Sequence, residues 1–509
     1  MANDSDSIGF FAAERLENTS EKQPQKTALI AKEEELTFAA LNQRVQALAG
    51  HLQLEGLRQG DRVGLLLPNS TALPLSYYAT QKIGAVTVIL DARLRGKELQ
   101  GVLSDAALKL LIVHSQLLSE VQKILTIIKP MPLWVVNGDD DQSFEKRFAA
   151  PATAVSLPRL SPNDDALILY TSGTTGEPKG VVLSYQNLVQ YPRVMREMGI
   201  TDASSVRGCI LPMSHIVGPV LCNELAERGF TLVIFDQINP VTLLEGIQKH
   251  RISVFEAVPI VFQLILGVRN LADYDTRSVR VAAMMGTTVP VPLLRAFKAA
   301  QPHIKVIQGY GLTEASPMIT LVEPEEAVAK MGSIGRAVPG VEVKIVDENG
   351  GEVSVGEPGE IITRGPHVMK GYFRKPEATA ARIRDGWLFT GDIAKRGEDG
   401  YYFHLGRRDE MIITGGLNVY PAEVEIMIYG YAKVQETIVF AMPDAKRGHV
   451  IGAAVVPRPG ETIVEKELLN FLRANLASFK VPQKIVIRES LPRTSSGKPI
   501  RNAETLLAN

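Results

Sequence analysis

The sequence Ala-Leu-Ile-Leu-Tyr-Thr-Ser-Gly-Thr-Thr-Gly-Glu-Pro-Lys-Gly spans residues 166–180 and changes character abruptly after its fifth residue. The first five residues are apolar or aromatic and predict a buried strand. The next ten hold four hydroxyl side chains, three glycines and Lys179. Glycine lets backbone N–H groups turn toward a ligand, successive amides form an anion-binding concavity, and a lysine adds a point charge suited to phosphate. The stretch therefore predicts a strand that ends in a phosphate-binding loop.

This loop differs from a Walker A loop, in which the lysine is followed by Ser or Thr. Here Lys179 follows Pro178 and precedes Gly180. A flexible linker rich in Gly, Ser and Thr is the alternative interpretation. The linker is disfavoured because residues 181–183 predict a second strand, and Ser184 is a suitable cap for a helix after it.

Apolar strands alternate with helical segments over roughly the first three hundred residues. Strands are predicted at 27–30, 62–67, 84–90, 110–114, 133–137, 206–211, 230–235, 254–258, 280–285 and 305–308. Continuous apolar strands separated by helices indicate mostly parallel sheets covered on both faces. Residues 139–162 are acidic and then rich in Ala, Pro and Ser, and we expect a surface connection there.

After Gly332 the sequence predicts short strands separated by turns, and a further α+β unit follows residues 406–409. We therefore expect an α/β fold. It has a large N-terminal domain (1–405) with mostly parallel sheets and a β-rich subdomain, a hinge (406–409), and a small mobile C-terminal domain (410–509).

The composition is that of an ordinary soluble protein. The formal net charge of −1 over 509 residues gives no electrostatic case for a nucleic-acid partner or an anionic membrane surface. Only Cys209 and Cys222 occur, in apolar settings, which predicts buried thiols and a cytoplasmic location. No signal peptide or transmembrane segment is expected; peripheral membrane contact is left open.

Several motifs together resemble the adenylate-forming enzymes, which include acyl-CoA synthetases, adenylation domains of peptide synthetases and luciferases. They are the loop at 170–180, Gly-Tyr-Gly-Leu-Thr-Glu at 309–314, Trp-Leu-Phe-Thr-Gly-Asp at 387–392, Gly-Arg-Arg-Asp at 406–409, the segment 412–425, and Leu-Pro-Arg-Thr-Ser-Ser-Gly-Lys at 491–498. The motifs follow the family's order and spacing, and the resemblance covers about residues 10 to 505. It implies the two-domain fold described above.

The resemblance also implies roles for individual residues in binding Mg·ATP. The phosphate loop comprises Thr171, Ser172, Gly173, Thr174, Thr175, Gly176 and Lys179. The adenine and α-phosphate side comprises Gly309, Tyr310, Gly311 and Thr313. Glu314 is implied to bind Mg²⁺, Asp392 to hold the ribose, and Arg407 to reach the ribose and phosphates. Lys498 would bridge the substrate carboxylate and the α-phosphate. The resemblance thus implies four catalytic residues: Thr171, Lys179, His215 and Lys498.

The remaining expectations concern the second substrate and the domain motion. Asp409 matches the hinge position, and Gly415 and Gly416 match the element that lines the pantetheine tunnel. His215, Val258, Gly286 and Gly311 are expected to line the acyl pocket. For His215, a hydrogen-bonded core histidine is the alternative. Thr288 stands where the family more often has proline, so no adenine contact is assigned to the residues around it.

The implied reaction activates a carboxylic acid with ATP and Mg²⁺ and passes the acyl group to coenzyme A. Rival interpretations are an enzyme that loads a carrier protein in trans and a nucleotide-binding protein without catalysis. Segments 216–218, 257–259 and 284–288 contain no Arg or Lys, which favours an apolar monocarboxylic acid over a dicarboxylate. Residues 212–218 contain no acid, which disfavours an amino acid. A fatty acid is expected first and an aryl acid second; a homodimer is left open.

Overall fold

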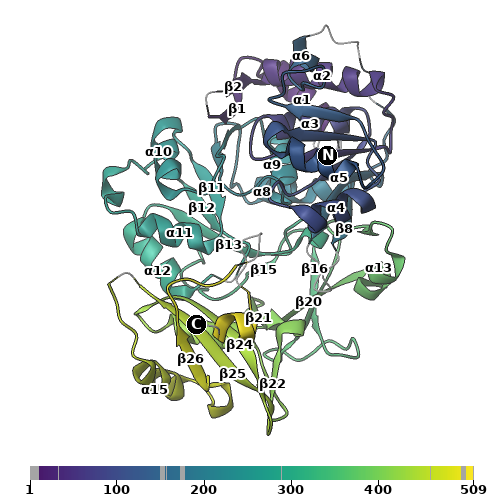
Figure 1. The fold of residues 1–509 in the computed structure, drawn as a ribbon. Coiled ribbons are helices and arrows are strands. Elements are labelled where there is room, and N and C mark those ends of the chain that lie inside the picture. Colours follow the sequence, from purple (N-terminus) through teal and green to yellow (C-terminus); the bar gives the residue numbers. More distant parts are fainter. Residues whose placement is uncertain are drawn as a thin grey trace, which may run out of the picture.

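The structure is a computed structural model that describes residues 11–32, 34–149, 155, 158–171, 178–287, 289–458, 460–493 and 500–507. A large α/β domain forms the upper part of Figure 1, and a smaller C-terminal domain lies below it. The described residues form four sheets, two in the α/β layers, one in a β-rich subdomain and one in the C-terminal domain.

The seven-stranded sheet contains the strand predicted at the start of the phosphate loop. Its order is β18-β8-β7-β4-β3-β5-β6. The strands are β3 (Arg62–Leu66), β4 (Val86–Ile89), β5 (Leu110–His114), β6 (Leu133–Val136), β7 (Asp165–Thr171), β8 (Lys179–Ser184) and β18 (Gly371–Tyr372). The strands β7, β4, β3, β5 and β6 run parallel, whereas β8 pairs antiparallel with both β7 and β18.

The nine-stranded sheet has the order β15-β14-β13-β12-β11-β9-β10-β1-β2. Its strands are β1 (Thr27–Ala31), β2 (Glu34–Thr37), β9 (Val206–Cys209), β10 (Thr231–Ile234), β11 (Val254–Ala257), β12 (Val281–Met284), β13 (Lys305–Tyr310), β14 (Thr320–Val322) and β15 (Arg336–Ala337). The strands from β13 to β1 along this order are parallel, so their carboxyl ends share one edge.

Helices fill the space between the two large sheets and cover their outer faces. The inner helices are α1 (Ala12–Lys22), α2 (Phe38–Leu54), α3 (Ala72–Lys82), α7 (Tyr185–Leu188), α8 (Gln190–Glu197) and α9 (Val217–Arg228). The outer helices are α4 (Gly96–Asp105) and α5 (Ser115–Leu125) on the seven-stranded sheet, and α10 (Pro240–His250), α11 (Pro259–Leu266) and α12 (Val291–Ala300) on the other. Because strands such as β4 and β5 are covered on both faces, they are apolar except for Thr87 in β4 and His114 at the end of β5.

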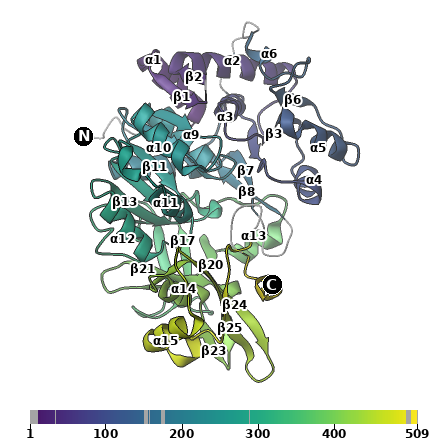
Figure 2. The ribbon, with the colours of Figure 1, turned by 60° about the vertical axis from the view of Figure 1, so that its left-hand side comes forward.

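The β-rich subdomain and the C-terminal domain follow. The subdomain contains β16 (Glu342–Val346), β17 (Gly359–Arg364), α13 (Pro376–Arg382), β19 (Ile383–Arg384), β20 (Trp387–Arg396) and β21 (Tyr402–Arg407). The C-terminal domain contains β22 (Ile412–Thr414), β23 (Leu417–Val419), α14 (Pro421–Tyr429), β24 (Val434–Asp444), β25 (Gly448–Pro457), α15 (Glu465–Asn475), β26 (Lys484–Ile487) and α16 (Ala503–Leu507). Figure 2 shows α14 between this domain's sheet and the large domain.

The predicted α/β class is confirmed, and the predicted strands appear within a few residues of their expected bounds. Ser184 forms a capping box at the start of α7, as its position suggested. Cys209 and Cys222 are both free and buried. Within the described part of the chain, no helix is long and apolar enough to cross a membrane.

Two expectations differ from the structure. Residues 139–162 do not form only a surface connection, because this segment contains the short helix α6 (Lys146–Ala149) and buries Phe144 to 1 % exposure. Phe144 belongs to the same apolar cluster as Trp134 and the buried residues of α2, and its ring packs edge-on against Phe148 with centroids 5.2 Å apart. Strand β21 extends through Gly406 to Arg407, so the subdomain sheet includes the first half of the predicted hinge. Asp409 lies in the short 3₁₀ helix Arg408–Glu410 that follows.

His367 is a fully buried histidine whose environment makes the large domain sensitive to acid. The Thr363 hydroxyl donates to the Glu342 carbonyl oxygen and lies 2.8 Å from His367 Nε2, so Nε2 carries the proton. Nδ1 has no hydrogen-bond partner among the described residues. Burial lowers the pKa of His367 from 6.5 to about 4, because the protonated ring loses its hydration.

We predict that wild-type protein loses stability as pH falls below 6.5, and that His367→Gln loses less. A lowered histidine pKa stabilises the fold fully above the unfolded pKa, and the contribution is lost as pH falls toward the folded pKa. The loss at pH 4 is about 3 kcal/mol. Melting temperatures between pH 7.5 and 4 measure it, with the exposed His449→Gln as control. Parallel curves for wild type and His367→Gln would contradict the prediction.

Candidate active site

Four residues predicted for the site lie at the carboxyl ends of four strands of the nine-stranded sheet. Tyr310 ends β13, Gly286 follows β12, Val258 follows β11, and His215 follows β9. These strands occupy successive places in the sheet. Because parallel strands end at one edge, these four residues form a row from Tyr310 to His215.

Asn69 joins this edge to the carboxyl end of β3 in the other large sheet. Its amide nitrogen donates to the carbonyl oxygens of Leu211 (2.9 Å) and Phe235 (2.8 Å), and its amide oxygen accepts from the Met213 backbone N–H (2.7 Å). The side chain thus fixes the loop before His215 relative to the seven-stranded sheet. Asn69 was not among the predicted site residues, because an asparagine after Pro68 is typical of an ordinary turn.

The base of the predicted phosphate loop is an antiparallel pair between β7 and β8. Thr171 pairs with Lys179, and the Thr171 hydroxyl lies 3.5 Å from the Lys179 carbonyl oxygen. Residues Ser172, Gly173, Thr174, Thr175 and Gly176 lie outside the described residues. The Lys179 ammonium stands 5.6 Å from the centroid of the Tyr372 ring, close enough for a cation–π contact.

Tyr372 also contacts Glu314, the residue predicted to bind Mg²⁺. The Tyr372 hydroxyl donates to Glu314 Oε1 at 2.9 Å, and the Glu314 side chain is buried. Burial and the neighbouring Glu314 carboxylate raise the pKa of Tyr372 to about 12, so its hydroxyl stays protonated and remains a donor. Tyr372 reaches this position because β18 pairs with β8, which carries Lys179. Tyr372 was not among the predicted site residues, because no local sequence pattern indicates the pairing of β18 with β8.

The surroundings of Glu314 fit a magnesium ion held jointly with nucleotide phosphates. Mg²⁺ usually takes one or two carboxylates, several waters and phosphate oxygens. The described residues contain no cluster of three or more His, Cys, Asp or Glu side chains that could hold a metal alone. One carboxylate with an oxygen not used by Tyr372, near Lys179, is the donor set that such a shared ion requires.

Asp392 is a buried carboxylate at the centre of a polar network. Tyr310 donates its hydroxyl hydrogen to Asp392 Oδ2 at 2.5 Å, and Arg407 Nη1 lies 3.2 Å from Oδ1. The His404 ring stacks on Tyr310 with centroids 5.9 Å apart. Burial alone would raise the pKa of Asp392, but His404, Arg407 and Tyr310 outweigh it and lower the pKa. Asp392 is therefore ionised and able to accept hydrogen bonds.

Arg407 connects this carboxylate to the predicted hinge. Its Nε lies 3.2 Å from Asp409 Oδ1, while Nη1 contacts Asp392. Gly391 permits the approach, because it has a φ of +76° and a Cβ there would lie 3.2 Å from Arg407 Nη2. Its backbone N–H donates to Glu360 Oε1 at 2.8 Å, and Glu360 Oε2 accepts from Arg408. Two consecutive arginines thus anchor the end of β21.

The glycines beside Tyr310 serve close backbone packing. A Cβ on Gly311 would lie 1.3 Å from the Pro317 carbonyl oxygen, and one on Gly309 would lie 3.0 Å from the Thr320 carbonyl oxygen. Thr313 begins a short 3₁₀ helix, Thr313–Ala315, that contains Glu314. At the other end of the row, a Cβ on Gly286 would meet Val258 Cγ1 at 3.1 Å, so these two predicted pocket residues are neighbours.

His215 is half exposed and contacts two residues that sequence analysis did not consider. Its Nε2 lies 3.0 Å from Arg93 Nη2 and 3.8 Å from Asp91 Oδ2. Arg93 and Asp91 form a two-pronged ion pair with distances of 2.9 and 2.6 Å. Because Arg93 is always a donor, Nε2 of His215 acts as the acceptor in this contact. The alternative of a buried core histidine is wrong for His215, since 47 % of its side chain is exposed.

The predicted pantetheine element lies apart from this row. Gly415 and Gly416 form the turn between β22 and β23, with φ of +56° and +81°. Figures 1 and 2 both place this hairpin at the end of the C-terminal domain remote from β13. Lys498 lies outside the described residues, which resume at Ile500, where the backbone N–H donates to the Pro492 carbonyl oxygen.

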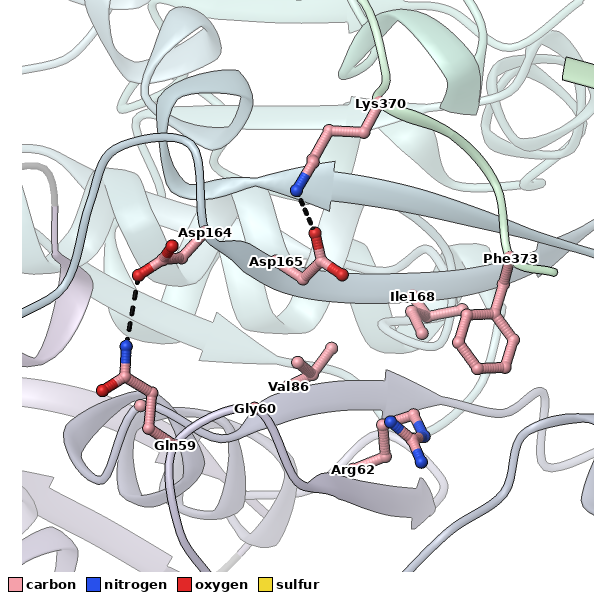
Figure 3. Close-up of a pocket in the computed structure, with 10 residues that line it drawn as sticks. Gln59, Gly60, Arg62, Val86, Asp164, Asp165, Ile168, Lys370 and Phe373 are labelled. Carbon is pink, nitrogen blue, oxygen red and sulfur yellow. Dashed lines mark hydrogen bonds and ion pairs between the residues drawn. The ribbon is translucent and has the colours of Figure 1, made fainter. Parts of the chain in front are cut away.

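Two cavities lie at the opposite edge of the sheets. One, of about 300 Å³, opens at the amino ends of β3, β4 and β7, where Lys370 pairs with Asp165 and Gln59 donates to Asp164 (Figure 3). The other, of about 740 Å³, opens at the amino ends of β12 and β13. Neither is lined by a predicted site residue, so the row from Tyr310 to His215 remains the candidate site.

Comparison with known proteins identifies the family of this chain. The AMP-binding enzyme family matches residues 16–373, and the AMP-binding enzyme C-terminal domain matches residues 423–498. The long-chain-fatty-acid–CoA ligase of Bacillus subtilis is 33 % identical, covering 96 % of this chain and 92 % of its own. The feruloyl-CoA synthase of an Amycolatopsis species is 35 % identical, covering 94 % and 95 %.

Solved structures are similar over nearly the whole length. The anthranilate CoA ligase AuaEII bound to anthranoyl-AMP superposes with a TM-score of 0.90 at 26 % identity, covering 98 % of this chain and 97 % of its own. ATP-bound MatB from Rhodopseudomonas palustris gives a TM-score of 0.90 at 29 % identity, covering 98 % of both chains. The o-succinylbenzoate CoA synthetase of Bacillus subtilis with ATP and magnesium gives 0.84 at 29 % identity, covering 96 % and 98 %. The chain therefore belongs to the AMP-binding enzyme family and is an ATP-dependent acid–CoA ligase that uses Mg²⁺.

Proposed function

We propose that the acid is an apolar monocarboxylic acid of the fatty-acid type, activated as acyl-AMP and then transferred to CoA. The observation that carries this proposal is the charge balance beside His215. Arg93 is the cation in contact with His215, and Asp91 already neutralises it through two hydrogen bonds. A second carboxylate on the substrate would have to displace Asp91 to gain that charge.

The rest of the row is apolar or small, which suits a hydrocarbon chain. Val258 and Gly286 are neighbours at the ends of β11 and β12, and Ile216 and Val217 lie half-buried beside His215. The same ion pair disfavours an α-amino acid. The acidic side chain near His215 is that of Asp91. The ammonium group of an amino-acid substrate would have to compete with Arg93 for the Asp91 carboxylate.

An aryl acid is the second candidate. Relatives at 32–35 % identity include a feruloyl-CoA synthase and an indoleacetate–CoA ligase, both named for aromatic acids. A similar level of identity, 33 %, links the chain to a long-chain-fatty-acid–CoA ligase. The local charge balance fits both classes, because both supply one carboxylate on an apolar body.

The described residues would divide the binding of ATP between two regions. Lys179 and Glu314, joined through Tyr372, would face the phosphates that leave as pyrophosphate, and Mg²⁺ bound there would neutralise their charge. Tyr310 would stack on the adenine and the ionised Asp392 would accept hydrogen bonds from the ribose hydroxyls. In both half-reactions highly charged groups are displaced, so positioning and charge stabilisation dominate catalysis.

We further propose that the C-terminal domain rotates about Asp409 between the two half-reactions. Lys498 would serve acyl-AMP formation, and the turn Gly415–Gly416 would serve thioester formation. The turn lies remote from β13 in the present orientation (Figures 1 and 2). It can therefore reach the row only after the domain has moved, a hinge closure in the general sense.

Substrate identity is tested by ATP–pyrophosphate exchange with a panel of carboxylic acids. We expect exchange with straight-chain fatty acids, weaker exchange with aryl acids, and little with dicarboxylic or amino acids, because the charge beside His215 is already balanced. The specificity constant for each acid is the measurement. Strongest exchange with a dicarboxylic or an amino acid would overturn the proposal.

Lys498→Ala separates the half-reactions. We predict that it abolishes acyl-AMP formation but leaves thioester formation from supplied acyl-AMP largely intact, since Lys498 stabilises charge only in the first step. Exchange and single-turnover thioester assays measure the two steps. Lys466→Ala, an exposed lysine of α15, is the control. Equal loss of both steps would refute this division.

Asp392→Asn tests the proposed ribose contact. We predict that AMP binds about tenfold more weakly, because hydrogen bonds to an ionised group are worth about 1.5–3 kcal/mol. Titration calorimetry with AMP measures the change. Asp385→Asn, in the exposed turn between β19 and β20, is the matched control in the same sheet. Unchanged affinity in Asp392→Asn would remove this residue from the nucleotide site.

A further inference from the structure

A network of buried charges lies on the nine-stranded sheet, outside the row of predicted site residues. It consists of Arg207 on β9, Glu256 on β11, Glu224 on α9 and Tyr191 on α8. Arg207 Nη2 donates to Glu256 Oε2 at 2.9 Å and to the Tyr191 hydroxyl at 2.5 Å, and Tyr191 donates to Glu256 Oε2 at 3.0 Å. Arg207 Nη1 pairs with Glu224. All four side chains are buried, and we call them the ion network.

The stability of the core does not account for the ion network. Glu256 Oε1 and Arg207 Nε are buried and have no hydrogen-bond partner among the described residues. A buried ion pair is often no more stable than apolar side chains of similar volume, because each ion loses its hydration. Charges that stand in an otherwise apolar layer at such a cost therefore call for a role other than stability.

The ion network occupies the layer of helices between the two large sheets. Val254 on β11 belongs to the apolar cluster of this inner layer, whereas Phe255 belongs to the cluster on the outer face. Because side chains alternate along a strand, Glu256 shares the inner face with Val254. Its partners on α8 and α9 come from inner helices as well.

The ion network lies just below the row that would bind the acid. Glu256 precedes Val258, a predicted pocket residue, by two residues, which span about 7 Å of extended chain. In the sheet, Glu256 lies between Cys209 on β9 and Ala283 on β12. Met285, which follows β12 at the level of the row, packs against the same inner cluster. A hydrocarbon chain that passes from the row into the inner layer therefore meets the ion network after a short distance.

We propose that the ion network is the floor of the acyl pocket and limits the acid to a short or medium hydrocarbon chain, such as hexanoate or octanoate. The inference rests on the proposed activation of a fatty acid. A longer chain would have to separate Arg207 from its carboxylates and place methylene groups against charges that have lost their partners, which is strongly unfavourable. The ion network thus makes chain length a determinant of specificity.

Wild-type enzyme should show an optimum of chain length. Each methylene group that the pocket buries should raise the specificity constant about fourfold, until the chain reaches the floor. Beyond that length the specificity constant should fall, so that dodecanoate is used about tenfold less well than octanoate.

The experiment measures specificity constants in ATP–pyrophosphate exchange with butanoate, hexanoate, octanoate and dodecanoate. The variant Arg207→Leu/Glu224→Leu/Glu256→Ala removes the three charges together, so that none is left unpaired, and it opens space at the floor. The ratio of the specificity constants for dodecanoate and hexanoate should rise about tenfold in this variant. General damage to the enzyme would lower both constants and leave their ratio unchanged.

A second variant tests the floor without changing a charge. Ala283→Leu enlarges a buried side chain level with Glu256, so it should lower the ratio of octanoate to butanoate about tenfold. The matched control is Val281→Leu, on the same face of β12 but one step lower, where it pairs with Val254. This control should keep the wild-type ratio. If the triple variant does not fold, as its melting curve would show, the comparison of Ala283→Leu with Val281→Leu decides.

Three outcomes would overturn the floor: equal use of dodecanoate and octanoate by wild type, an unchanged ratio in a folded triple variant, or an unchanged ratio in Ala283→Leu. The same assays keep this inference separate from the proposed function. Exchange with fatty acids of every length would contradict only the floor, whereas absent exchange with all of them in wild type would contradict the proposed class of acid.

Discussion

The buried carboxylate of Asp392 is the interaction on which the arrangement of the site depends. It accepts from Tyr310 at the end of β13 and lies 3.2 Å from Arg407 at the end of β21, and Arg407 in turn reaches Asp409. One ionised group therefore joins the nine-stranded sheet, the β-rich subdomain and the predicted hinge. An uncompensated charge at this depth would be costly, so the surrounding donors both permit the burial and fix the relative positions of these elements.

Sequence patterns predicted the parallel sheets well, because strands covered on both faces must be apolar along their length. β5 appears at 110–114 as expected, and the strand before the phosphate loop appears as β7. The row from Tyr310 to His215 depends on the same parallel arrangement, since residues that follow successive parallel strands meet at one edge. The predicted ends of strands were less accurate where a strand finishes in polar residues. An example is β21, which ends at the charged residue Arg407.

Side-chain contacts between distant segments were not predictable. Tyr372 reaches Glu314 only because β18 pairs with β8, and Arg93 reaches His215 only because the two large sheets end at a common edge. Asn69 accounts for part of that alignment through three hydrogen bonds to the other sheet. A sequence read segment by segment gives residue types, but charge balance between segments requires the fold. The compensation of Arg93 by Asp91 is such a case.

Two described parts of the C-terminal domain lie at different distances from the large domain. Arg501 lies 3.1 Å from Glu410 beside the hinge, so the chain on the carboxyl side of Lys498 returns close to the large domain. The β22–β23 hairpin lies at the far end (Figures 1 and 2). A rigid domain can present only one of two opposite ends to a single row of residues. Under the proposed division of labour between the half-reactions, the β22–β23 hairpin would need a different orientation of the domain to reach that row, a hinge closure in the general sense.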